Sequence, residues 1–408
     1  MKLSLESGKK ENLIVFLTFI TYFAVTISKY CYSASLPSII DYFQISKSEA
    51  GLITTIMFIV YGTGQVLHGL FCKFYNVKYS VFIGMALSGL ATLLMPFLPF
   101  SIYPYLMAIN GIGCSFLWTS LVRLMAENLS EKKLSAAILA NAFSVSLGVA
   151  FSYGLSALSS FLSHFQISFY VGGSFALLIA FLWLFLINIS NANVSRCLQK
   201  NEEKNRDGKK KIAFPILFML TIFALTAIAN NMIREGVVSW TPKILIDTYS
   251  LNESLSTILT IINSILSLLG TFFALVLRKK IKNDMVLSFI FFFIATLSSV
   301  LLTFFYNNSI AIFILSAAII SLSMGAVNNI VTAIVPVYFR NEMSSGLIAG
   351  LMDGFCYIGS AISGYGLGLI AENKGWQGVF ILFLVSGIVV SVLLIAGIIL
   401  KKKKESQN

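Results

Sequence analysis

Charged residues are scarce in this 408-residue chain, in which Asp, Glu, Lys and Arg make up only 11% of the total. Hydrophobic residues make up 57%, and the mean hydropathy is +0.86. These values exclude an ordinary water-soluble globular protein. The 5 cysteines are an odd number, scattered, with no CxxC pair. That pattern argues against a disulfide framework or a metal site and favours small packing residues.

The sequence also lacks the short motifs of common enzymes. It contains no GxSxG, HExxH or P-loop run and no paired-carboxylate arrangement. Its one long polar segment has no interleaved aromatic residues, as a nucleic-acid patch would. We therefore expect no enzymatic activity, no metal, no cofactor and no nucleic-acid partner.

Apolar runs of about 20 residues, the length that a helix needs to cross a bilayer, recur along the whole chain. A transmembrane β-barrel would instead show short alternating segments. The first run is too long for a signal-peptide core, so we expect it to remain as a helix. The sequence predicts an all-α membrane protein with twelve transmembrane helices, at residues 13–36, 50–72, 79–100, 103–125, 134–160, 167–189, 213–237, 255–277, 284–306, 309–337, 345–371 and 376–400.

The long polar segment, which includes SRCLQKNEEKNRDGKKK, falls between the sixth and seventh predicted helices. It predicts a six-helix half at 1–190, a cytoplasmic linker at 191–212 and a second six-helix half at 213–408. The halves resemble each other, because Pro37 and Pro242 are each followed by branched apolar residues and an aspartate. Two pseudo-symmetric halves are typical of secondary transporters, whose substrate site lies near the membrane midplane.

Basic residues predict the orientation of the helices. By the positive-inside rule, 24 of the 29 Lys and Arg residues fall on the side that both termini share. Lys47, Lys243 and Lys374 fall on the opposite side. We therefore expect an integral, multi-pass protein of a bacterial-type plasma membrane, with both termini cytoplasmic. The net charge of +12 then reflects orientation and attraction to anionic lipid headgroups.

This assignment leaves two cations inside the membrane. Lys29 and Arg234 each lie eight residues before a proline, and they are 205 positions apart. At about 1.5 Å per residue each lies roughly 12 Å below its proline, near mid-membrane. A charge at that depth is costly and is expected to face a partner or a wet cavity. One interpretation is a structural ion pair with Glu235 or Asp353, or a snorkelling lysine; the other is a substrate-binding cation in each half.

Several polar or small residues in the predicted helices have two interpretations. Asn328 and Asn329 are expected either to line a cavity or to bond a neighbouring helix. Glycine runs are expected to allow close helix approach, and in a transporter they would also allow sliding. These runs contain Gly62, Gly64, Gly111, Gly113, Gly364, Gly366 and Gly368.

The run Arg234, Gly236, Trp240 and Pro242 has the form Arg-x-Gly-x3-Trp-x-Pro. With it, the chain resembles the major facilitator superfamily, and within it the organophosphate:phosphate antiporters, which include glycerol 3-phosphate and hexose 6-phosphate transporters. The resemblance extends over nearly all predicted membrane segments. Further matching residues are Tyr61, Gly62, Asn110 to Gly113, Trp118, Arg123, Gly346, Ala349, Gly350, Phe355, Tyr357, Gly359, Gly375, Trp376 and Gly378.

The chain also departs from that family. It has Ser28 and Lys29 where those antiporters have an Arg-Lys pair, Gln65 at a lysine position and Ser144 at a histidine position. Phosphate recognition favours a bidentate guanidinium, whereas a lysine is a compact point charge. The resemblance implies a substrate site formed by Lys29, Arg234, Tyr61, Gln65, Trp118, Asn141, Ser144, Asn231 and Tyr357, with Asp353 and Glu235 for coupling or charge balance.

The leading hypothesis is a secondary active transporter that works by alternating access. A small organic anion, such as an organic phosphate exchanged for inorganic phosphate, would bridge the two cations. The alternatives are a proton-coupled carboxylate or sugar-acid symporter, and a non-transporting membrane sensor of an anionic ligand. The expected partners are the lipid bilayer, the anion, and phosphate or protons as the coupled species, and the protein is expected to be a monomer.

Overall fold

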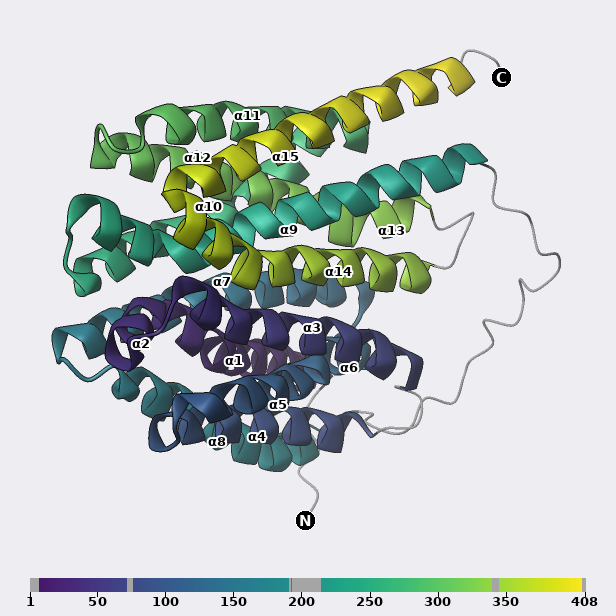
Figure 1. Cartoon of the computed structure of the whole chain (residues 1–408). Coiled ribbons are helices and arrows are strands. Elements are labelled where there is room, and N and C mark those ends of the chain that lie inside the picture. Colours follow the sequence, from purple (N-terminus) through teal and green to yellow (C-terminus); the bar gives the residue numbers. More distant parts are fainter. Residues whose placement is uncertain (1–6, 72–75, 191, 193–213, 340–344, 406–408) are drawn as a thin grey trace. The chain divides into compact units, whose positions relative to one another are not determined.

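The computed structural model describes residues 7–71, 76–190, 192, 214–339 and 345–405 (Figure 1). Within these residues every regular element is helical, so the predicted all-α class is confirmed. Eleven stretches are long and apolar enough to span a membrane. The last of them, Ile348–Leu400, contains Gly375, whose φ of 67° interrupts the helix. This break separates the predicted eleventh and twelfth helices.

The chain forms two compact units. The first contains Met1–Gln44 and Ile56–Glu202, and the second contains Ile45–Thr55 and Glu203–Asn408. The predicted linker at 191–212 lies outside the described residues, apart from Ala192. Residues 45–55 pack with the second unit although they precede most of the first along the chain. Packing of residues 45–55 with the second unit cannot be inferred from hydropathy.

The first unit contains eight helices and two short 3₁₀ turns among its described residues. They are α1 (Ser7–Ala34), α2 (Leu36–Phe43), α3 (Lys47–Phe71, from Ile56 onward), α4 (Val77–Leu94), η2 (Met95–Phe97), η3 (Phe100–Ile102), α5 (Tyr103–Ser115), α6 (Leu117–Asn128), α7 (Glu131–Phe161) and α8 (Gln166–Ile189).

One predicted helix of this unit is followed by a separate short helix, and another is divided in two. The helix expected at 13–36 ends at Ala34, and α2 follows with Pro37 in its first turn. A proline there loses no hydrogen bond, because the first N–H groups of a helix have no intrahelical partner. The helix expected at 103–125 is interrupted at Phe116, between α5 and α6.

Close packing of small residues joins the helices of the first unit. Helix α1 contacts α4, α7 and α8, and α4 contacts α5 and α8. A Cβ built on Gly84 would lie 2.6 Å from the Gly113 carbonyl oxygen, and one on Gly113 would lie 2.5 Å from that of Gly84. Only glycine permits this approach of α4 and α5, as expected between membrane helices.

The second unit contains seven helices and two π-helical segments among its described residues, together with the first turns of α3. They are α9 (Phe214–Tyr249), α10 (Glu253–Arg278), α11 (Asp284–Phe305), α12 (Ile310–Asn329), η5 (Ile330–Ile334), α13 (Val335–Tyr338), α14 (Ser345–Ala361), η6 (Ile362–Gly366) and α15 (Leu367–Glu405).

Helix α9 is the centre of this unit. It contacts α10, α12, α14 and α15, and within it lie Arg234 and Glu235. The predicted helix at 213–237 is therefore too short, since α9 continues through Pro242 to Tyr249. Pro242 removes one backbone N–H, but the packing on four sides keeps the helix continuous.

Candidate substrate-binding site

Lys29 lies in α1 among aromatic rings of the first unit. Its Nζ is 4.5 Å from the ring centroid of Tyr61, 5.2 Å from that of Tyr30 and 5.3 Å from that of Phe58. Ring faces attract an ammonium group by about 0.5–2 kcal/mol, and more when water is excluded. They do so without supplying a negative charge. Of the predicted site residues, the structure thus brings Lys29 and Tyr61 together.

Ser28, beside Lys29, belongs to a buried hydrogen-bond network. Its Oγ lies 2.9 Å from Ser88 Oγ and 2.6 Å from Thr92 Oγ1. Asn110 joins this network, since its Nδ2 donates to Thr92 Oγ1 at 3.2 Å and its Oδ1 accepts from Ser88 Oγ at 2.8 Å. Ser28 is only 1% exposed. It therefore joins α1 to α4 and α5, and Lys29 alone carries the charge of this pair.

Arg234 forms an ion pair with its neighbour in the chain. Its Nη2 donates to Glu235 Oε1 at 2.7 Å and to Asn231 Oδ1 at 3.3 Å. The Arg234 side chain is 25% exposed, whereas that of Glu235 is 4% exposed. The first interpretation given above, a pair of Arg234 with Glu235, is thus present in the structure. It does not exclude anion binding, because the guanidinium has further N–H donors.

The rest of the Arg-x-Gly-x3-Trp-x-Pro run fixes α9 in place. A Cβ on Gly236 would lie 2.5 Å from Leu367 Cδ1 and 3.0 Å from the Phe383 ring on α15, so glycine lets α9 pack closely against these side chains. Trp240 is 1% exposed, and its indole Nε1 donates to the Ser363 carbonyl in η6 at 2.8 Å. This carbonyl lies in a π-helical segment, where helical hydrogen bonds are rearranged. Gly236 and Trp240 therefore position Arg234 by packing.

Further polar groups of the second unit surround Arg234. Asn231 Nδ2 donates to Asn328 Oδ1 at 3.2 Å, so Asn328 bonds a neighbouring helix, which was one of its two interpretations. Cys356 on α14 lies close to the Asn231 side chain and near the ionisable groups of Asp353, Arg234 and Glu235. Asp353 and Tyr357 are half-buried on α14. The structure thus groups Arg234, Glu235, Asn231 and Asp353.

Four other predicted residues lie elsewhere in the first unit. Asn141 and Ser144 on α7 are fully buried, and Asn141 Nδ2 donates to Thr18 Oγ1 at 3.2 Å and to the Ala137 carbonyl at 2.9 Å. Ser144 Oγ donates to the Asn141 carbonyl at 2.7 Å. The Trp118 and Tyr22 ring centroids lie 5.2 Å apart with the ring planes tilted by 31°, and Gln65 is half-buried on α3. The bond from Asn141 to Thr18 joins α7 to α1, whereas the hydrogen bond of Ser144 stays within α7.

Comparison with known proteins identifies the family. The model of the Major Facilitator Superfamily matches residues 18–364. The chain belongs to this superfamily. No curated protein sequence matches the chain significantly.

Two similar solved structures have the superfamily fold. Both are of a bacterial homolog to the human lysosomal transporter Spinster, one inward-facing and occupied, the other inward-facing and unoccupied. The first has 14% sequence identity and a TM-score of 0.71, and the match covers 94% of this chain and 96% of that one. The second has 14% identity and a TM-score of 0.70, with 95% of each chain covered. The family confirms a multi-pass membrane transporter rather than an enzyme.

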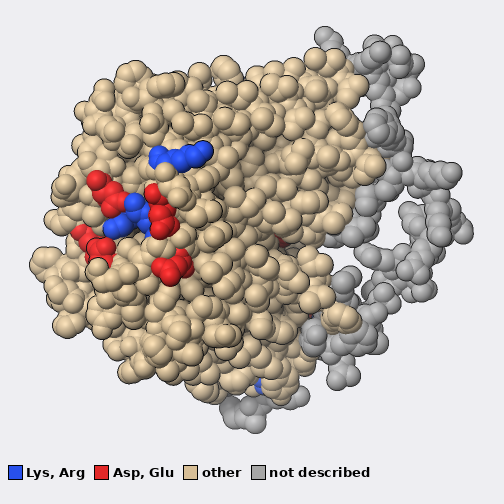
Figure 2. Space-filling model, in the orientation of Figure 1, with Lys and Arg blue, Asp and Glu red and all other residues tan. Residues whose placement is uncertain are grey.

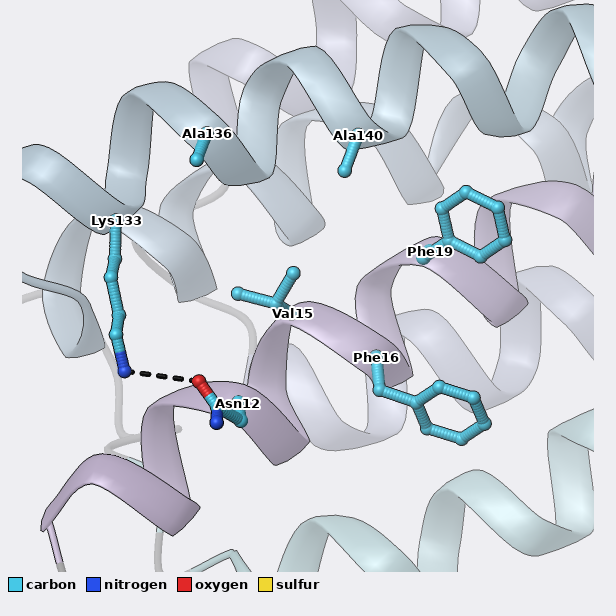
Figure 3. A pocket seen from close by; sticks show the side chains of 7 residues that line it. All are labelled: Asn12, Val15, Phe16, Phe19, Lys133, Ala136 and Ala140. Carbon is cyan, nitrogen blue, oxygen red and sulfur yellow. Dashed lines mark hydrogen bonds between the residues drawn. The ribbon is translucent and has the colours of Figure 1, made fainter.

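A pocket of about 370 Å³ opens between α1 and α7 of this superfamily member (Figure 3). Apolar side chains line most of it, with Lys133 and Asn12 at one end, where Lys133 Nζ donates to Asn12 Oδ1 at 3.0 Å. Lys133 also pairs with Glu11 Oε2 at 3.0 Å. None of the predicted site residues lines this pocket, and its lysine already has a carboxylate partner.

Sequence reasoning missed a charged cluster in the second unit. Lys47, at the start of α3, pairs with Asp247 Oδ2 at 2.8 Å, and Lys243 Nζ lies 3.4 Å from Asp247 Oδ1. Trp376 Nε1 donates to Asp247 Oδ2 at 3.1 Å, and its ring lies 4.8 Å from Lys47 Nζ. Most of the described surface visible in Figure 2 is uncharged, and most of its charged side chains gather in one region. The Lys243 and Asp247 spacing of four residues was the available signal.

The Thr55 side chain joins α3 to the end of α14 and to η6. Thr55 Oγ1 donates to the Ala361 carbonyl at 2.6 Å and accepts from the Tyr365 N–H at 2.8 Å. One backbone N–H of the π-helical segment thus has its hydrogen-bond partner on α3. A Cβ on Gly364 would lie 2.5 Å from the Gly51 carbonyl oxygen. The predicted role of Gly364 in close helix approach is confirmed.

Proposed function

We propose that the chain is a secondary active transporter of a small organic anion, and that it exchanges an organic phosphate for inorganic phosphate by alternating access. Lys29 in the first unit and Arg234 in the second each supply a positive charge to the transported anion. The observation that carries the proposal is Arg234 itself. Its side chain is partly exposed within a helix long and apolar enough to span a membrane, and it is positioned by Gly236 and Trp240.

Physical chemistry supports both cations in this role. A charged residue within a membrane helix is costly and is expected to face a partner or a wet cavity. The Arg-x-Gly-x3-Trp-x-Pro run that resembles organophosphate:phosphate antiporters lies in the middle of α9. A guanidinium can bind two phosphate oxygens at once, and an ammonium held by ring faces can add a point charge.

A second candidate function is proton-coupled uptake of a carboxylate or sugar acid. The grouping of Asp353 with Arg234 and Glu235 around Cys356 favours it, because a carboxyl group beside the anion site can carry a proton through the cycle. Gln65 and Ser144 stand where the phosphate antiporters have a lysine and a histidine. The site then has fewer positive charges, which suits a monovalent anion better than a dianion.

Counterflow of labelled phosphate in proteoliposomes tests these functions. We expect phosphate-loaded vesicles to take up labelled phosphate, and unlabelled glycerol 3-phosphate outside to compete with it. Uptake of a labelled sugar acid, driven by an inward proton gradient and without phosphate exchange, would instead favour the second function. Ligand binding without flux of either would favour a sensor and contradict transport.

The proposed orientation places both termini and the linker in the cytoplasm of a cell with a bacterial-type plasma membrane. The excess of Lys and Arg on that side supports it. We propose that the protein works as a monomer of two six-helix halves, at 1–190 and 213–408, joined by the linker at 191–212. Labelling of single cysteines introduced at each terminus, carried out on intact cells, tests the orientation.

A further inference from the structure

We infer that Glu235 is a tethered anion, which occupies Arg234 when no substrate is bound and which the transported anion displaces. This inference rests on the proposed function, since it assigns a role to Glu235 at the same anion site. It adds that the transporter can change between its outward-facing and inward-facing states without a bound substrate. Such a transporter can perform net uptake as well as exchange.

The contact between the two side chains is that of a ligand with its site. Glu235 Oε1 lies 2.7 Å from Arg234 Nη2, the distance of a charge-assisted hydrogen bond. A carboxylate presents the same kind of negatively charged oxygen as a carboxylate or phosphate substrate. Glu235 therefore makes at Arg234 the contact that the transported anion is proposed to make.

The exposure of the two side chains differs. The Arg234 side chain is 25% exposed, whereas that of Glu235 is 4% exposed. An incoming anion can thus reach the Arg234 side chain, while the Glu235 carboxylate that contacts it is buried. Consecutive side chains on a helix point about 100° apart, so this pair does not follow from helix geometry as an i,i+4 pair does. The long Arg234 side chain must bend toward its neighbour.

Asn231 keeps the guanidinium in place during the exchange of anions. Its Oδ1 accepts from the same Arg234 Nη2 at 3.3 Å, and its Nδ2 donates to Asn328 Oδ1 on α12 at 3.2 Å. This anchor does not depend on Glu235. When a substrate replaces the Glu235 carboxylate, Arg234 remains oriented by the amide of Asn231.

The tether explains how an empty transporter could move. A buried cation without a counter-charge is unfavourable, and the pair removes this obstacle when substrate has left. Because Glu235 is the next residue in the chain, its effective concentration at Arg234 is high and it returns as soon as the anion departs. The cost is competition, since every substrate must first displace the tethered carboxylate.

Glu235→Gln tests this role, because the amide keeps the shape of the side chain but removes its charge. In purified protein, we expect the phosphate concentration that gives half-maximal thermal stabilisation to fall about tenfold, since the competitor is gone. In proteoliposomes, exchange in phosphate-loaded vesicles should persist. Net uptake into phosphate-free vesicles should fall at least about tenfold relative to exchange, because the empty transporter has lost the carboxylate that lies 2.7 Å from Arg234.

Glu127→Gln is the matched control. Glu127 Oε1 lies 2.8 Å from Arg123 Nε on α6, so the control removes a carboxylate from an arginine at nearly the same distance. It should change neither the phosphate affinity nor the ratio of net uptake to exchange. Glu235→Asp is a second variant, for use also if Glu235→Gln folds poorly. It keeps the charge with a shorter reach, so we expect a smaller gain in affinity and retained net uptake.

Two results would overturn the inference. A phosphate affinity that is unchanged or lower in folded Glu235→Gln protein would mean that Glu235 orients Arg234 or only stabilises the fold. An unchanged ratio of net uptake to exchange would mean that the empty transporter does not need this carboxylate. The proposed function fails separately: wild-type vesicles would show no exchange of phosphate, while the thermal assay would still report a tighter phosphate site in Glu235→Gln.

Discussion

The ammonium of Lys47 lies 2.8 Å from the carboxylate of Asp247, which joins the first turn of α3 to the last turns of α9. Asp247 also accepts from the Trp376 indole at 3.1 Å and lies 3.4 Å from Lys243. One carboxylate therefore connects three helices of the second unit.

Asp247→Asn should lower the stability of the protein. The substitution removes the negative charge that Lys47, Lys243 and the Trp376 indole contact. A hydrogen bond to a charged group contributes about 1.5–3 kcal/mol. We expect a loss of about 2 kcal/mol at this partly exposed site. Thermal unfolding in detergent measures it, with Glu127→Gln, which removes a single ion pair, as the comparison. Equal melting temperatures for the two variants would show that the cluster contributes no more than a single ion pair.

Gly364→Ala should be destabilising, whereas Gly354→Ala should not. A Cβ on Gly364 would lie 2.5 Å from the Gly51 carbonyl oxygen and 2.6 Å from Thr55 Oγ1. Separating these backbones is expected to cost about 1–3 kcal/mol, as for overpacking elsewhere. A Cβ on Gly354 in α14 would meet no atom of another described element within 4 Å, and alanine has the higher helix propensity. Comparison of the two melting temperatures in the same detergent tests the close approach.

Arg234→Lys should weaken anion binding while leaving the fold intact. Lysine keeps the charge but loses the planar fork, so we expect phosphate affinity to fall roughly 10-fold to 100-fold. Isothermal titration of purified protein with phosphate measures it. Arg123→Lys, which changes the arginine of the Arg123–Glu127 pair, is the control and should bind phosphate normally. Unchanged affinity in well-folded Arg234→Lys protein would rule out the binding role.

Lys29→Gln should weaken binding according to the charge of the ligand. The ammonium over the ring of Tyr61 acts as a point charge, so its removal should affect glycerol 3-phosphate more than glycerol. For the phosphate ester we expect a loss of about 10-fold in affinity, equivalent to about 1.4 kcal/mol. Competition with labelled phosphate in counterflow measures the ester, and thermal stabilisation compares both ligands. Equal losses for the two would assign Lys29 to packing.

Much of the fold follows from composition and periodicity. Scarce charge and repeated apolar runs predicted the all-α class and the twelve membrane segments, because a bilayer leaves few ways to satisfy the backbone. Helix ends were harder to predict. Pro37 begins α2, whereas Pro242 lies within the continuous α9, and the same residue type gives both outcomes. Contacts made by α9 with its neighbours decide the difference.

The sequence by itself determined that Lys29 and Arg234 are cations within membrane segments. A charge is costly in hydrocarbon, so a cation in the middle of an apolar run can be recognised from its position alone. Only the tertiary structure decided their partners. It places the rings of Tyr61 and Phe58 beside Lys29, and Glu235 and Asn231 at Arg234. Hydropathy depends on each residue's own transfer energy, whereas these contacts depend on how helices pack and side chains bend. That is why the Lys47–Asp247 pair became visible only in three dimensions.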